Sequence, residues 1–105
     1  MEIYETLDNH YNIRQFLGAG NYAKVYLVTN INDNNEYAAK IRKDENNFQH
    51  ELQMTTVASG LNNPNIIHLN GHGVGSINKN GKITNNVNYL IFEYCPNGDL
   101  SIYSK

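Results

Sequence analysis

A glycine-rich segment, Gly18-Ala19-Gly20, separates two stretches that have the composition of β-strands. Residues 11–17 partly alternate between apolar and polar side chains, and residues 25–29 are dense in β-branched and aromatic residues. An asparagine-rich turn at 30–35 leads into a third apolar stretch at 36–41. The pattern therefore predicts an antiparallel meander of three strands whose first turn is rich in glycine.

The period of the apolar residues changes after this meander. Small and apolar residues then recur at steps of three and four, as on one face of a helix: Phe48, Leu52, Thr55, Ala58 and Leu61. Asp44 is suited to cap the start of this helix, and Ser59-Gly60 to end it.

Two further strands are predicted in the second half of the chain, at 66–69 and 89–94. Between them we expect a long polar connection, which begins with a flexible glycine-rich exit at 71–75 and contains a hairpin turn at Asn80-Gly81. The predicted fold class is α+β, a five-stranded antiparallel sheet with one main helix. Residues 1–10 are expected to be a loose lead-in.

Length and composition limit what the chain can do. A chain of 105 residues has room for one small domain, and its net charge of −2 gives no reason to expect binding to nucleic acid. The apolar runs are too short to span a bilayer, and the N-terminus lacks a signal-peptide pattern. Cys95 is the only cysteine, which excludes a disulfide framework and a Cys-rich zinc site. A soluble, cytoplasmic protein without membrane or nucleic-acid partners is expected.

The glycine-rich segment is suited to contact a polyphosphate, because glycine lets backbone N–H groups approach phosphate oxygens. The pattern of Gly18–Ala23 also fits the dinucleotide-binding fingerprint. That fingerprint opens a helix, however, whereas the residues after Lys24 favour a strand. An ordinary glycine hairpin is the simpler alternative for this segment taken alone.

Lys40 and Glu51 are the second candidate feature. Lys40 ends a predicted strand after two alanines, where it would be either a solvated edge charge or a phosphate ligand. Glu51 shares a helix face with Phe48 and Thr55, so its carboxylate would point inward and need a cation. Lys40 is the obvious candidate, and the pair would direct the ammonium toward the phosphates of a nucleotide.

Five segments, in order, resemble the N-terminal lobe of a eukaryotic protein kinase. They are residues 17–25 (LGAGNYAKV), 37–40 (YAAK), 48–51 (FQHE), 63–69 (NPNIIHL) and 89–100 (YLIFEYCPNGDL). The resemblance covers about residues 11 to 103 and implies a partial protein kinase domain over 11–105. The main helix would be the one that kinases call αC.

The resemblance implies an ATP site. The glycine-rich loop would cover the phosphates, and Lys40, held by Glu51, would contact the α- and β-phosphates. Phe92 would be the gatekeeper at the back of the pocket, and Asp99 could reach the ribose. Three side chains would form the roof over adenine (Leu17, Val25 and Ala38), and the main chain of Glu93 and Cys95 would bind its edge. The implied cofactor-binding residues are Leu17, Gly18, Ala19, Gly20, Asn21, Tyr22, Ala23, Val25, Ala38, Lys40, Phe92, Glu93, Cys95 and Asp99.

The sequence departs from the family pattern. Ala23 replaces the third glycine, and Thr55 stands where a bulky apolar residue is usual. The His-Arg-Asp, Asp-Phe-Gly and Ala-Pro-Glu motifs are absent from the 105 residues, and with them the catalytic base and the magnesium ligands. We therefore expect no kinase activity from this stretch alone and weak ATP binding. It is either part of an enzyme or a stand-alone lobe that docks on a kinase C-lobe or another protein through its underside.

Overall fold

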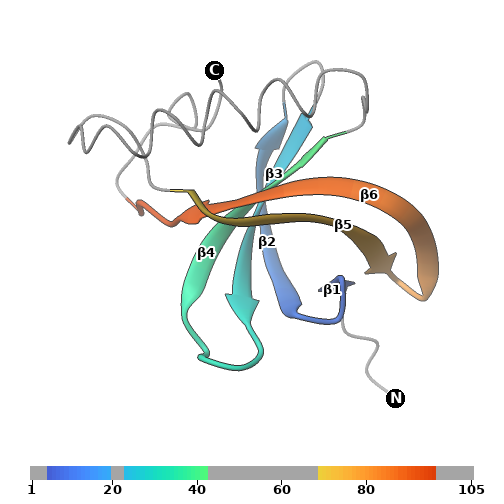
Figure 1. The fold of residues 1–105 in the computed structure, drawn as a ribbon, viewed down its shortest axis with the longest axis horizontal. Helices are drawn as coiled ribbons and strands as arrows, with labels where there is room; N and C mark the ends of the chain where they lie inside the picture. The colour runs from blue at the N-terminus through green and yellow to red at the C-terminus, as the bar shows by residue number, and fades with distance from the viewer. Residues whose placement is uncertain (1–4, 20–22, 43–68, 97–105) are drawn as a thin grey trace.

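The computed structural model describes residues 5–19, 23–42 and 69–96, which form six strands (Figure 1). The strands are β1 (Thr6–Leu7), β2 (Tyr11–Ala19), β3 (Ala23–Asn30), β4 (Glu36–Arg42), β5 (Leu69–Lys79) and β6 (Lys82–Glu93). They form a closed barrel in the order β1-β2-β3-β4-β6-β5, and every pairing is antiparallel. The predicted antiparallel sheet is confirmed, but the predicted number of five strands is wrong.

The meander of β2, β3 and β4 agrees with the prediction from sequence. Ala19 ends β2 opposite Lys24, and Ala23 begins β3, so the glycine-rich segment joins two antiparallel strands. A dinucleotide fingerprint would need a helix to begin here, and that alternative is therefore excluded. The loop residues 20–22 themselves lie outside the described residues.

The strand that was not predicted is β1, which lies in the segment expected to be a loose lead-in. Leu7 is fully buried, and Thr6 and Leu7 pair with both β2 and β5, which closes the barrel. The expectation was wrong at these two positions because a two-residue strand is too short to show a period in the sequence. The strand is held in place by pairing with the adjacent β2 and with β5, which is distant in the sequence.

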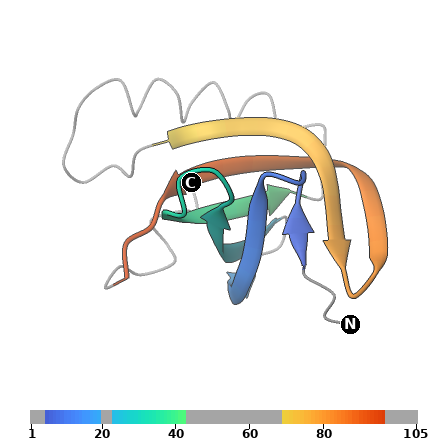
Figure 2. The ribbon, with the colours of Figure 1, turned by 90° about the horizontal axis from the view of Figure 1, so that it is seen from below.

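The segment expected to be a long connection is a hairpin of two long strands, β5 and β6, which curves around the shorter strands (Figure 2). The predicted turn at Asn80-Gly81 is confirmed. Both residues have positive φ, 55° and 83°, as a two-residue turn of type I′ requires.

The glycines of β5 belong to this strand and do not form the flexible exit that was expected. A Cβ atom on Gly73 would lie 2.6 Å from the hydroxyl oxygen of Tyr89, and one on Gly75 would collide with the carboxyl group of Asp8. Tyr89 donates a hydrogen bond of 2.8 Å to this carboxylate. The absence of side chains at these two positions therefore makes room for the Tyr89–Asp8 pair.

The helix predicted over Phe48–Leu61 and the strand residues 66–68 lie outside the described residues. Within the described ranges, the structure has no helix with the length and apolar character needed to cross a membrane.

The barrel buries two separate apolar clusters. The interior cluster has nine buried members, which come from every strand except β2: Leu7, Tyr26, Val28, Ala39, Ile41, Ile77, Val87, Tyr89 and Ile91. Tyr11 and Ile13 of β2 are partly buried and pack against them. The second, here named the outer cluster, has four buried members: Val25, Ala38, Leu90 and Phe92. Because neighbouring residues of a strand point to opposite faces, the two clusters lie on opposite faces of the sheet.

Candidate functional site

The outer cluster brings together five of the residues predicted to surround adenine. Val25, Ala38 and Phe92 are buried members, and Leu17 and Cys95 pack against them. They come from β2, β3, β4, β6 and the segment after β6. Residues that are distant in the sequence therefore converge on one face.

The cross-strand register shows how β4 organises this face. Ala38 lies opposite Leu27 of β3 and Phe92 of β6, and two residues later Lys40 lies opposite Val25 and Leu90. Directly opposed residues of antiparallel strands share a face. Lys40 is therefore on the same face as Ala38, one cross-strand row further along β4.

Lys40 is almost completely buried, with 5% of its surface exposed, and this excludes the solvated edge charge considered from the sequence. A buried ammonium group requires a polar or charged partner, because its desolvation is costly. Its predicted partner Glu51 lies outside the described residues.

The glycine-rich segment approaches the same row. Gly18 lies opposite Val25, which in turn lies opposite Lys40, so the three residues form one line across β2, β3 and β4. Leu17 lies in a bulge between the pairs of Phe16 and Gly18 and packs against the outer cluster. The start of the glycine-rich segment and the buried lysine therefore lie in one cross-strand row. Gly20, Asn21 and Tyr22, which would complete this loop, are outside the described residues.

The segment after β6 lies at the other end of the cluster. Glu93 is the last residue of β6 and is exposed, and Cys95 is partly buried. Burial raises the pKa of the Cys95 thiol, and the nearby Glu93 carboxylate adds to this effect. The thiol is therefore protonated at neutral pH and is a poor nucleophile. Asp99 lies outside the described residues.

Two residues of the cluster were not among the predicted binding residues. Leu90 is fully buried and lies directly opposite Lys40, and Leu69 packs from β5 opposite Phe92. The signal for Leu90 was its place in an uninterrupted apolar run, which does not reveal which face each residue takes.

Side chains of the types that bind metal ions do not cluster in the part of the chain that the structure describes. No group of three His, Cys, Asp or Glu side chains there is arranged to hold a metal ion. His72 is exposed on β5, and His68 lies outside the described residues.

Comparison with known families gives one match. The family described as Protein kinase domain matches residues 11–105, which are 95 of the 105 residues. A search of curated proteins found no match.

Proposed function

Because this chain belongs to the protein kinase family, we propose that residues 11–105 form the lobe that holds ATP for protein phosphorylation. One observation carries the proposal. Side chains from five strands form a single apolar cluster directly beside the buried Lys40.

The outer cluster suits a flat apolar ring such as adenine. Leu17, Val25 and Ala38 would cover one side of the ring, and the small side chain of Ala38 would leave space for it. Phe92, which is 3% exposed, would limit the depth of the pocket. Main-chain groups of Glu93, the last residue of β6, and of Cys95, two residues later, would pair with the adenine edge.

The phosphates would lie toward the row of Gly18, Val25 and Lys40. Along β4 this row is about 7 Å from Ala38, because a strand rises about 3.4 Å per residue. Adenine on Ala38 and phosphates near Lys40 therefore follow from one ligand orientation. Glu51 would fix the lysine, and the N–H groups of the glycine loop would donate to the phosphate oxygens.

Phosphoryl transfer also needs a base and magnesium ligands, and the 105 residues contain none of the motifs that supply them. We therefore assign ATP binding to this stretch, and no phosphorylation by this stretch alone. Incubation with radiolabelled ATP and a generic protein substrate should give background labelling, and robust labelling would refute this part of the proposal.

ATP binding is tested by titrating the isotopically labelled 105-residue chain and following its backbone NMR signals. We expect saturable shifts at Val25, Ala38 and Cys95, with a Kd of about 1 mM because part of the site is missing. Lys40→Met should weaken binding about tenfold, equivalent to about 1.4 kcal/mol.

Lys82→Met is the matched control, because Lys82 is an exposed lysine at the start of β6. It should change the affinity by less than about twofold, as expected for a solvated charge. Equal losses in the two variants, or no saturable shift at the outer cluster, would refute ATP binding at this site.

A further inference from the structure

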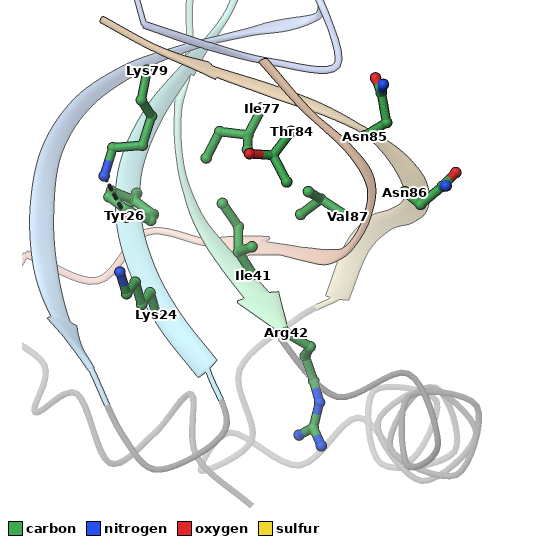
Figure 3. Close-up of a pocket in the computed structure, with 10 residues that line it drawn as sticks. All are labelled: Lys24, Tyr26, Ile41, Arg42, Ile77, Lys79, Thr84, Asn85, Asn86 and Val87. Atoms are coloured by element: carbon green, nitrogen blue, oxygen red, sulfur yellow. Dashed lines mark hydrogen bonds between the residues drawn. The ribbon is translucent and has the colours of Figure 1, made fainter. Parts of the chain in front are cut away.

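A cavity of about 490 Å³ opens between the start of β3, the end of β4 and the half of the β5–β6 hairpin that is nearer its turn (Figure 3). Three apolar side chains from three strands line it: Ile41, Ile77 and Val87. All three belong to the interior cluster. The cavity therefore lies on the opposite face of the sheet from the outer cluster and Lys40.

One side of the cavity carries a group of hydrogen-bond donors. Lys79 donates a hydrogen bond of 3.0 Å to the hydroxyl oxygen of Tyr26, and its ammonium lies 5.0 Å from the centre of the ring. Lys24 is two residues before Tyr26 on β3, and Figure 3 shows both lysines on the Tyr26 side of the cavity. The phenol proton and the remaining ammonium protons are available to a further acceptor.

The charge of this group is positive. The hydrogen bond with Tyr26 raises the pKa of Lys79, and Glu5 adds to this effect, so the ammonium stays charged at neutral pH. The described residues that line the cavity include no Asp or Glu. Arg42 also borders the cavity, although its side chain points away from the donor group (Figure 3). The whole chain has a net charge of −2, so this concentration of positive charge is local.

We propose that this cavity is a second ligand site, which binds a small organic anion with one carboxylate or phosphate group on an apolar body. Lys24, Tyr26 and Lys79 would bind the anionic group, and the apolar body would lie on Ile41, Ile77 and Val87.

A small molecule fits better than an extended acidic peptide. The donors converge from two strands on one region, which suits a single anionic group, whereas a row of acidic side chains would need donors spread along a surface. The volume lies within the range of about 300–1,000 Å³ that is typical of small-molecule sites. The proposal is independent of ATP binding, because it uses none of the residues on the nucleotide face.

The test is an NMR titration of the 105-residue chain with 1-naphthyl phosphate, which combines an apolar body with one anionic group. We expect saturable shifts at Tyr26, Lys79 and Val87. Inorganic phosphate and neutral 1-naphthol should each bind at least about tenfold more weakly, because each satisfies half of the site. Shifts centred on Val25 and Ala38 would overturn the proposal, as would preferential binding of an oligoglutamate peptide.

Variants that remove one charge distinguish binding in this cavity from general electrostatic attraction of the anion to the chain. Lys79→Met should weaken binding at least about fivefold, whereas Lys82→Met removes the same charge outside the cavity and should change it less than about twofold. Tyr26→Phe keeps the ring and removes the hydroxyl, so it tests the donor group even where Lys79→Met fails to fold. Lys40→Met should leave naphthyl phosphate binding unchanged, whatever its effect on ATP. Equal losses in Lys79→Met and Lys82→Met, or unchanged binding in Tyr26→Phe, would overturn the proposal.

Discussion

The two faces of the barrel sheet differ in what they bury. The interior cluster draws apolar side chains from all six strands, and Tyr89, one of its two buried tyrosines, donates a hydrogen bond to Asp8. The outer cluster has fewer buried members and lies beside the buried cation of Lys40. Apolar packing of the interior kind stabilises a fold, whereas burial of a charge has a desolvation cost. The interior face therefore contributes most of the packing that stabilises the barrel, and the outer face combines a smaller apolar cluster with a buried cation.

The family match and the barrel also differ in extent. The match begins at residue 11, whereas the barrel is closed by β1 at Thr6–Leu7. Residues before the matched range therefore complete the interior cluster. The outer cluster consists wholly of residues within that range.

The largest effect is expected from Leu7→Ala. Leu7 is fully buried and links β1 to the interior cluster, so its truncation leaves a cavity and should lower the free energy of unfolding by about 3 kcal/mol. Urea denaturation measures this loss. Ile31→Ala is the control, since Ile31 is 50% exposed and should change stability little. Similar small losses in both variants would show that β1 is not part of the core.

Two neighbouring residues of β4 allow a direct test of the two faces. Ile41→Ala should cost about 2 kcal/mol of stability and leave ATP binding intact, because Ile41 belongs to the interior cluster. Lys40→Met should weaken ATP binding about tenfold, because it removes the ammonium group that would contact the phosphates. Urea denaturation measures the stability of Ile41→Ala, and ATP titration compares binding by the two variants. The division between the faces is wrong if Ile41→Ala weakens ATP binding as much as Lys40→Met does.

Prediction from sequence succeeded where a local period or turn signal exists. The meander 11–41 has runs of alternating and β-branched residues, and Asn80-Gly81 has the residues that a type I′ turn needs. It failed at β1 and β5. Thr6–Leu7 is held by pairing with the adjacent β2 and with the distant β5, and the polar, glycine-rich β5 lacks the usual composition of a strand. In β5, glycine is required by the bulk of Tyr89 and Asp8, which no local pattern reveals.

The two candidate sites also differ in how far the sequence indicated them. The resemblance indicated five residues of the outer cluster, because it preserves their order along the chain, but it did not indicate Leu69 or Leu90 as binding residues. The cavity beside Tyr26 and Lys79 was not predicted from the sequence. These two residues are 53 residues apart and meet only through the curvature of the barrel. Which strands neighbour each other is a property of the topology, and a single sequence does not show it.

A smaller effect is expected from Tyr89→Phe, which removes the partner of Asp8 within the barrel. Loss of this partly buried hydrogen bond to a carboxylate should cost about 1.5 kcal/mol near pH 7. Tyr37→Phe is the matched control, since Tyr37 donates a similar bond of 2.9 Å to Asp33 in an exposed position. Its loss should cost clearly less, and equal losses would show that burial does not distinguish the two pairs.

The Tyr89 pair also predicts a dependence of stability on pH. Burial first, and then the hydrogen bond to Asp8, raise the pKa of Tyr89 above its ordinary value of 10.0. The unfolded tyrosine therefore ionises at lower pH than the folded one, and its contribution to stability is complete below pH 10 and is lost as the pH rises further. The slope approaches about 1.4 kcal/mol per pH unit from this group. Urea titrations at pH 9 to 11 should show a shallower decline in Tyr89→Phe, and parallel declines would contradict the assignment.

The smallest effect is expected at the hairpin turn, which lies apart from both clusters. Asn80 has φ of 55°, a left-handed conformation that asparagine tolerates better than alanine, so Asn80→Ala should cost about 1 kcal/mol. Asn80→Gly should cost less, since glycine adopts this conformation without a steric penalty. Both variants should bind ATP as the unchanged chain does, because the turn joins β5 and β6 at the end far from Phe92 and Glu93. If Asn80→Ala weakens ATP binding, the hairpin transmits its conformation to the outer face, and stability and ligand binding are not divided between the two sides of the sheet.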